Sequence, residues 1–392
     1  MSADATKGVT AARGFRAAGV AAGIKAGGRP DLAIVVNDGP HEAAAGTFTR
    51  NKVKAAPVLW SREVLSHGRL RAVVLNSGGA NACTGPAGFA DTHATAEHAA
   101  NMLDVGAVEV AVCSTGLIGE RLPMPAVLSG VEKAAAALAA TPAASLDAAR
   151  AVMTTDTVPK QAAVRHPDGW TVGGLAKGAG MLAPSLATML VVLTTDAAAD
   201  AVELDAALRR ATRTTFDRLD VDGSCSTNDT VLLLSSGASG ARPDPDELRQ
   251  AVTAVCAELA RQLQADAEGV TKRVSITASG ARSEDDAVAV ARAVARDSLV
   301  KTALFGADPN WGRIVAAAGM ADADLDPDRI DVTINGATLC RNGYAAADRA
   351  TADLSAPDVT VHIGLNLGGH GATILTTDLS HGYVEENSAY PS

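Results

Sequence analysis

Short apolar runs that end in glycine-containing turns predict several buried strands. The runs at 33–36, 72–75 and 107–113 contain few polar positions, which is typical of strands that are covered on both faces. Residues 270–276 instead alternate apolar and polar positions, as a half-exposed strand does.

A helix is predicted to begin after Asp244, because this N-cap residue is followed by Pro245 at the first helical position and by Glu247 three residues on. Apolar residues then recur at helical spacing. They are Leu248, Val252, Val255, Leu259 and Leu263.

Three further stretches predict helices. Ser283 with Asp286 begins a helix that runs to Val300, and the alanine-rich stretches 126–150 and 197–213 are helical in composition. Strands and helices therefore alternate along the chain, without a repeat of 20–50 residues or a Pro/Gly/Ser-rich linker. This order predicts a mixed α/β protein with closely packed parts.

Composition limits the classes of partner. The chain has 392 residues, of which 47% are apolar and 20% charged, enough for two or three core-sized units. The formal net charge is −10 and aromatic residues make up 3%. An acidic chain with few aromatic residues lacks the basic face and the stacking platforms that nucleic-acid binding uses, so we expect no nucleic-acid partner.

Cysteine and histidine usage predicts neither a metal nor a redox site. The five cysteines show no C-x-x-C spacing, and the eight histidines form no metal-binding signature. The first residues have no apolar signal-peptide region, and no apolar run has the roughly 20 residues that span a membrane. We therefore expect a cytoplasmic protein without a metal, a cofactor or a membrane contact.

The glycine-rich segment around Lys177 has the densest chemical signal. A P-loop places its lysine directly after the second glycine and before Ser or Thr, whereas Lys177 precedes Gly178. Gly178-x-Gly180-x-x-Ala183 formally matches a dinucleotide-binding motif, but the β-branched run that follows predicts a strand where that motif needs a helix. A non-catalytic dinucleotide-binding protein is therefore a weak alternative.

A third interpretation concerns Thr188. A hydroxyl becomes a nucleophile when a base removes its proton, and an N-terminal threonine can use its own α-amine, whose pKa lies near ~7.7–8.0. Cleavage after Ala187 would create that amine. From the residues alone, the start of a buried strand is the favoured explanation of Thr188.

Seven ordered motifs decide between these interpretations. The segment KGAGMLAPSLATML at 177–190 closely resembles the self-cleavage segment of the ornithine acetyltransferase (glutamate N-acetyltransferase) family of arginine biosynthesis. The resemblance extends from about residue 14 to the last residue and includes a similar C-terminal tail at 387–392. The other similar motifs lie at 76–85, 114–119, 154–157, 221–230, 268–272 and 306–313.

The resemblance implies an α/β fold in which two β-sheets are sandwiched by helices. It also implies self-cleavage between Ala187 and Thr188 into an α chain, 1–187, and a β chain, 188–392, which intertwine in one fold. Two pairs of chains are expected to assemble as a heterotetramer. The expected partners are the small molecules N-acetylornithine and glutamate, and the resemblance leaves open whether acetyl-CoA is also a donor.

The implied mechanism is ping-pong acetyl transfer through an ester on Thr188. By resemblance, Thr115 and Gly116 form the oxyanion hole, which needs donors aimed at the developing charge. Lys177 is the natural partner of a substrate carboxylate, and Glu268 could receive the ornithine ammonium group. The remaining substrate-binding residues implied by the resemblance are Thr154 or Thr155, Asn387 and Ser392.

Two departures and one rival function stay open. Gly79 stands where the family usually has Asn, and Ser392 stands where Thr is more frequent. An N-terminal-nucleophile amidase or aminopeptidase would share the activated hydroxyl but would pass the acyl group to water.

Overall fold

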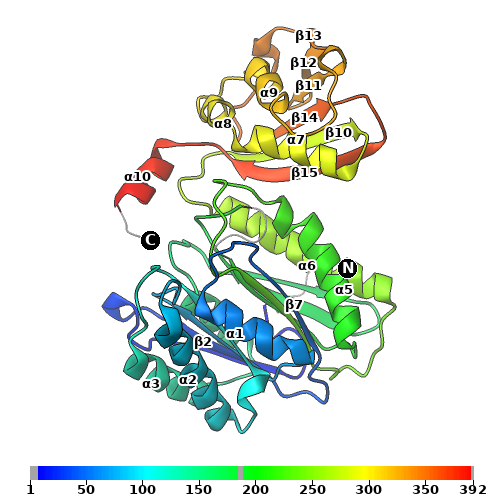
Figure 1. The fold of residues 1–392 in the computed structure, drawn as a ribbon. Helices are drawn as coiled ribbons and strands as arrows, with labels where there is room; N and C mark the ends of the chain where they lie inside the picture. Colours follow the sequence, from blue (N-terminus) through cyan, green and yellow to red (C-terminus); the bar gives the residue numbers. More distant parts are fainter. Residues whose placement is uncertain (1–7, 184–188, 390–392) are drawn as a thin grey trace. The chain divides into compact units, whose positions relative to one another are not determined.

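The computed structural model describes residues 8–183 and 189–389. The chain divides into two compact units (Figure 1). The first comprises the chain up to Asp217 together with Ser224–Leu263, and the second comprises Arg218–Gly223 and the chain from Gln264 onward. Each unit has its own sheets and its own apolar core.

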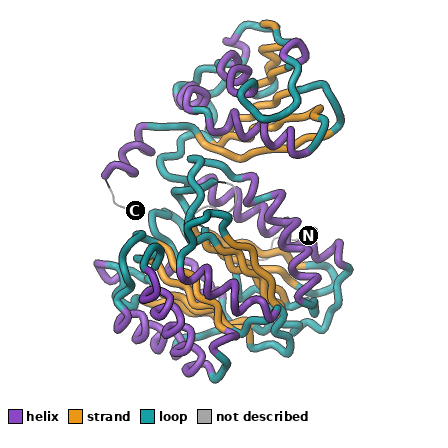
Figure 2. Tube along the Cα trace, in the orientation of Figure 1, coloured by secondary structure: helices purple, strands orange, loops and turns teal. Residues whose placement is uncertain are grey.

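Two sheets form the centre of the first unit (Figure 2). The four-stranded sheet has the order β1-β2-β4-β5, with bounds Phe15–Val20, Leu32–Asn37, Ala72–Ser77 and Val110–Thr115. The five-stranded sheet has the order β3-β9-β8-β7-β6, with bounds Ala44–Phe48, Thr230–Ser235, Leu190–Thr195, Thr171–Lys177 and Lys160–Arg165. Neighbouring strands are antiparallel except for two parallel pairs, β4 with β5 and β8 with β9.

Side chains of both sheets share one apolar core. Ile34 and Val74 of the four-stranded sheet belong to the same buried cluster as Leu175, Val192 and Leu232 of the five-stranded sheet. Strands buried on both faces need continuous apolar runs, which explains why these segments lack polar alternation.

Helices cover these sheets. In Figure 1, α2 and α3 lie along β2, and α5 and α6 lie along β7. Proline at the first or second position begins each of α1 to α4, where its missing N–H costs no hydrogen bond. The bounds are Ala56–Val64 for α1, Gly85–Leu103 for α2, Met124–Ala136 for α3, Pro142–Ala151 for α4, Ala201–Thr214 for α5 and Pro245–Ala265 for α6.

The second unit contains a six-stranded sheet of order β13-β12-β11-β14-β10-β15. The strand bounds are Arg273–Ala281 for β10, Asp331–Ile334 for β11, Ala337–Arg341 for β12, Tyr344–Ala345 for β13, Asp358–Gly364 for β14 and His370–Thr377 for β15. The helices are α7 (Glu284–Arg296), α8 (Ser298–Phe305), α9 (Trp311–Ala318) and α10 (His381–Ala389). Val290 and Val294 of α7 pack in one core with Val274 and Ile276 of β10.

The predicted mixed α/β class is confirmed, and the first unit has the expected pair of helix-covered sheets. The third sheet, in the second unit, was not anticipated. The predicted strands at 33–36 and 72–75 correspond to β2 and β4. The strand predicted at 107–113 is confirmed only from Val110, where β5 begins, because Ala107–Glu109 form a 3-10 turn. No helix of the described residues is long and apolar enough to cross a membrane.

Two predicted helices are each interrupted. The stretch 126–150 forms α3 and α4 because Pro142 begins a new helix whose N-cap is Thr141. The helix expected to reach Val300 ends at Arg296. Asp297 then caps α8, because its side chain accepts the Val300 N–H at 2.9 Å.

Helix α4 approaches strand β1 very closely. A Cβ placed on Gly19 would lie 2.0 Å from the backbone oxygen of Asp147 and 2.7 Å from the backbone nitrogen of Ala148. Backbone atoms cannot move aside as a flexible side chain can, so only glycine allows this contact.

We predict that Gly19→Ala lowers the free energy of unfolding by about 1–3 kcal/mol, because overpacking forces the strand and the helix apart. Gly106→Ala is the matched control, since this exposed glycine of the same unit has a negative φ and a Cβ there would meet only side-chain atoms, of Glu109 at 3.2 Å and Val108 at 3.7 Å. Urea unfolding of both variants measures the difference. Equal loss in the two variants would contradict the packing explanation.

Candidate active site

The ends of two strands place three of the residues selected from the sequence. Strand β5 ends at Thr115 and is followed by Gly116, and strand β7 ends at Lys177. Thr115 and Lys177 are each 1% exposed. A buried hydroxyl and a buried ammonium group therefore meet where the two sheets face one another.

The backbone around Gly116 is fixed by a neighbouring glycine loop. The Thr115 carbonyl accepts the N–H groups of Gly78 and Gly79, each at 3.0 Å. Gly116 has a φ of +130°, and a Cβ there would lie 2.5 Å from the Gly79 nitrogen. Position 116 therefore needs glycine, as expected for close backbone approach. A Cβ on Gly79 would lie 2.7 Å from Leu122 Cδ2, so glycine at this departure from the family pattern also fits its surroundings.

Lys177 joins two of the predicted hydroxyls. Its Nζ donates to Thr115 Oγ1 at 3.2 Å and to Thr154 Oγ1 at 2.9 Å. In the described part of the chain, no hydrogen bond connects Thr155 to this group. The structure thus brings Thr115, Thr154 and Lys177 together and favours Thr154 over Thr155.

The Asp156 carboxylate orders the lysines and the loop around them. Asp156 accepts Lys160 Nζ at 2.7 Å, the Gly178 N–H at 2.7 Å and the Thr154 N–H at 3.0 Å. Burial opposes ionisation of this carboxyl, but Lys177 and Lys160 outweigh that effect and lower its pKa to about 2. Asp156 lies in the motif at 154–157, of which only Thr154 and Thr155 were predicted to contact the substrate.

Lys25 is a further cation of this region that the sequence analysis missed. Its Nζ donates to the Met153 carbonyl, directly before Thr154, and to the Pro30 carbonyl. Burial, together with the charges of Arg29 and Lys177, lowers the Lys25 pKa to about 8 against the opposing effects of Asp31 and Asp156. No local motif surrounds Lys25, so only tertiary packing reveals it.

Hydrogen bonds to its backbone N–H and carbonyl hold Met189, the residue after Thr188, in place. The Met189 N–H donates to Asp229 Oδ1 at 3.0 Å, and the Met189 carbonyl accepts the Thr230 N–H at 3.1 Å. Asp229 is fully buried, and burial raises its pKa well above the usual value. Its Oδ2 has no hydrogen-bond partner among the described atoms. Asp229 belongs to the motif at 221–230, which carried no assigned role.

Three predicted positions, Ala187, Thr188 and Ser392, lie outside the described residues. The other two predicted substrate-binding residues belong to the second unit and contact each other there. Asn387 Nδ2 donates to Glu268 Oε2 at 3.0 Å and to the Tyr383 carbonyl at 2.9 Å.

One group of side chains in the first unit has the composition of a metal site. Possible ligand atoms of His166, Asp168 and Glu247 lie within 4.8 Å of one another. Asp168 is exposed, whereas His166 and Glu247 are partly buried, and His166 stacks on Trp170 with ring centroids 4.6 Å apart. Exposed acidic groups beside a histidine are common without an ion, and none of the three residues belongs to a motif of the acetyltransferase pattern.

We predict that Asp156→Asn destabilises the protein by about 3–5 kcal/mol at neutral pH, because it leaves buried lysine charges without their carboxylate. The lowered pKa means that the native carboxylate stabilises the fold above pH 3.8, and that this contribution is lost as the pH falls through about 2. Denaturant unfolding across this pH range should therefore show the difference between wild type and variant shrinking in acid. A difference that is independent of pH would contradict this assignment.

Comparisons with known proteins agree with the motif pattern. The sequence profile of the ArgJ family matches residues 16–392. "Arginine biosynthesis bifunctional protein ArgJ" of Mycolicibacterium paratuberculosis is 65% identical over 98% of this chain and 97% of its own. The protein of the same name from Streptomyces coelicolor is 58% identical over 98% of this chain and 100% of its own.

A solved structure of ornithine acetyltransferase complexed with ornithine, from Mycobacterium tuberculosis, is 65% identical. The structural match covers 47% of this chain and 97% of the solved chain, with a TM-score of 0.46. The profile match over nearly the whole chain, together with the two near full-length relatives, confirms the resemblance found in the motifs. The chain belongs to the ArgJ family.

Proposed function

We propose that this protein transfers the acetyl group of N-acetylornithine to glutamate in arginine biosynthesis, through an acetyl ester on Thr188. The proposal is supported by membership of the ArgJ family and by relatives whose name places them in arginine biosynthesis. The observation that carries it is the Lys177 ammonium group, which contacts the hydroxyls of both Thr115 and Thr154. The word "bifunctional" in the relatives' name supports acetyl-CoA as a second donor to glutamate.

Maturation supplies the nucleophile in this proposal. The Thr188 hydroxyl attacks the Ala187 carbonyl, the peptide C–N bond breaks, and the acyl group moves to the threonine oxygen while the nitrogen becomes a free amine. Water then hydrolyses the ester, which leaves the Ala187 carboxylate and an N-terminal Thr188. The two hydrogen bonds that fix Met189 support the proposal, because they hold the backbone next to the reacting residue.

Each half-reaction then passes through a tetrahedral oxyanion. The Thr188 hydroxyl gives its proton to the α-amine and attacks the acetyl carbonyl, and collapse of the intermediate releases ornithine. Glutamate attacks the resulting ester in the second half-reaction and leaves as N-acetylglutamate. The tight backbone at Gly116 supports Thr115 and Gly116 as the oxyanion donors, because a fixed donor needs no rearrangement as charge develops.

The substrate carboxylate is assigned to Lys177, with Thr154 as its hydrogen-bonding neighbour. Asp156 neutralises part of the charge of Lys160 and Lys177, and its hydrogen bonds to the Thr154 and Gly178 N–H groups fix the loops that present Thr154 and Lys177. Lys177 is thus pre-ordered for an anion. Glu268 is proposed to receive the ornithine ammonium group, with Asn387 and Ser392 completing the substrate contacts.

Cleavage would separate an α chain, 1–187, from a β chain, 188–392. Strand β7 belongs to the first chain and β8 to the second, and the two strands pair from Val172 with Thr195 to Lys177 with Leu190. Six residue pairs within one sheet would keep the products together after cleavage. Assembly as two α and two β chains, and a cytoplasmic location, are parts of the same proposal.

We predict that Thr188→Ala abolishes both cleavage and acetyl transfer, because alanine has no hydroxyl to attack either carbonyl. The denatured mass should show an uncut chain of 39.5 kDa for the variant and two fragments for the wild type. Thr188→Ser is the control, since it keeps the hydroxyl and should still be cleaved. An intact wild-type chain that still transferred acetyl groups would rule out the N-terminal nucleophile, whereas cleavage with acetyl release to water and none to glutamate would indicate an amidase.

We predict that Thr154→Val lowers kcat/KM for N-acetylornithine about tenfold, because Lys177 loses a hydrogen-bond partner at the substrate carboxylate. Thr155→Val is the matched control, since it makes the same change one residue away and should alter kcat/KM much less. Initial rates of ornithine release measure both variants, and their denatured masses show whether each has been cleaved. Equal losses, or a larger loss for Thr155→Val, would transfer the substrate contact to Thr155.

A further inference from the structure

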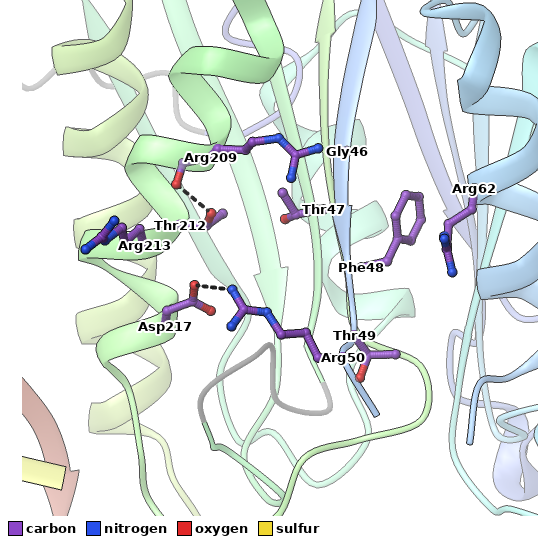
Figure 3. Close-up of a pocket in the computed structure, with 10 residues that line it drawn as sticks. All are labelled: Gly46, Thr47, Phe48, Thr49, Arg50, Arg62, Arg209, Thr212, Arg213 and Asp217. Carbon is purple, nitrogen blue, oxygen red and sulfur yellow. Dashed lines mark hydrogen bonds and ion pairs between the residues drawn. The ribbon is translucent and has the colours of Figure 1, made fainter. Parts of the chain in front are cut away.

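The first unit contains a cavity, apart from the candidate active site, that is lined by arginine side chains. It lies between the edge strand β3 and helix α5 and has a volume of about 520 Å³ (Figure 3). Its charged lining residues are Arg50 after β3, Arg62 of α1, Arg209 and Arg213 of α5, and one carboxylate, Asp217. Four arginines among the lining residues are unexpected in a chain whose net charge is −10, although Figure 3 shows the Arg213 side chain directed away from β3.

These positive charges are only partly neutralised. Arg209 pairs with Asp205 at 2.7 Å, whereas the contact of Arg50 with Asp217 is 3.9 Å long, beyond hydrogen-bond distance. Arg62 forms no ion pair or side-chain hydrogen bond in the described part of the protein. Figure 3 shows the Arg209 side chain extending from α5 towards β3. The cavity therefore has spare capacity to bind negative charge.

The wall formed by β3 adds polar groups without partners. Thr47 Oγ1 is buried in the cavity lining and has no hydrogen-bond partner among the described atoms. Strand β3 pairs with β9 on one side only. The Thr49 N–H donates to the carbonyl of Asp229, directly before β9, whereas the Ala44 N–H donates to the Gly68 carbonyl on the other side of β3. Because N–H groups alternate sides along a strand, the Gly46 N–H points to the same free edge as the Ala44 N–H.

The same strand leads to the candidate active site. The Thr49 N–H donates to the Asp229 carbonyl at 3.0 Å, and Thr49 Oγ1 donates to the Ser226 carbonyl at 2.6 Å. Asp229 in turn holds the Met189 N–H through its side chain. The cavity wall and the segment that follows Thr188 are thus joined by consecutive hydrogen bonds.

We propose that this cavity binds a small organic anion that carries a diphosphate or several phosphate groups. The groups that face it are mostly donors: guanidinium forks, the Thr47 hydroxyl and a backbone N–H. Guanidinium groups bind phosphate oxygens in pairs, and a tetrahedral phosphate accepts hydrogen bonds from more directions than a planar carboxylate. A volume of about 520 Å³ leaves room for an organic portion beside the phosphates. The alternative is that the arginines only protect the open edge of β3 from pairing with another chain.

The test is calorimetric titration of the full-length protein with inorganic pyrophosphate, ATP and citrate at constant ionic strength. Arg62→Gln and Arg209→Gln remove cavity charges, and Arg210→Gln is the matched control, because this exposed residue is the next one on α5 and does not line the cavity. We expect pyrophosphate and ATP to bind wild type and Arg210→Gln equally. Binding should weaken about tenfold for each cavity variant, since each loses charge-assisted hydrogen bonds.

Two outcomes would overturn the proposal. Equal binding of pyrophosphate to all variants, or no binding to wild type, would show that the arginines do not form a phosphate site. Citrate binding as tightly as pyrophosphate would show a response to charge alone. Light scattering of the cavity variants tests the edge-protection alternative. That alternative would be favoured if Arg62→Gln or Arg209→Gln self-associated while wild type bound no pyrophosphate.

Discussion

A single buried carboxylate organises the candidate active site. Asp156 accepts hydrogen bonds from Lys160, from the Gly178 N–H after β7 and from the Thr154 N–H. Two lysines inside an apolar core would repel one another and pay a large desolvation cost, so a carboxylate between them is needed to keep both charged. Its lowered pKa shows that attraction to the lysines exceeds the cost of burying the charge.

Charge and close backbone packing act together at the strand ends. The Asp156 carboxylate holds the end of β7 through the Gly178 N–H, next to Lys177. Gly116 and Gly79 allow the end of β5 to approach the neighbouring glycine loop, whose N–H groups donate to the Thr115 carbonyl. A side chain at Gly116 would clash with the backbone of Gly78 and Gly79. Thr115 and Lys177 are thus carried by strand ends, and hydrogen bonds to Asp156 hold the adjoining loop residues Thr154 and Gly178. Such fixed positions favour donors that are already in place when an oxyanion forms.

Along the chain, the proposed cleavage position comes between two strands of one sheet and not at a boundary between compact units. Strands β7 and β8 flank it and pair with each other, whereas the boundaries between the compact units fall at 217/218, 223/224 and 263/264. A cut between paired strands leaves their hydrogen bonds in place, so cleavage can create a new N-terminus without unfolding the protein. This explains why no linker composition marks the position in the sequence.

The sequence by itself determined the local elements and the family. Apolar runs, N-caps and prolines depend on residues close together in the chain, so they predicted β2, β4, α5 and α6. They failed where one helix ends and the next begins within a few residues, as at Asp297 and between Ala136 and Pro142. The ordered motifs identified the ArgJ family because whole segments, not single residues, were matched.

Only the tertiary structure decided which side chains meet. Lys177 contacts residues 23 and 62 positions away, and no local pattern encodes such separations. The choice of Thr154 over Thr155, the roles of Asp156 and Asp229, and the position of Lys25 all depend on how strands from distant segments pair. The arginine cavity depends on it too, because its side chains come from β3, α1 and α5. Local sequence sets the periodicity of an element, whereas packing of whole elements sets which of its faces meet and what charge gathers between them.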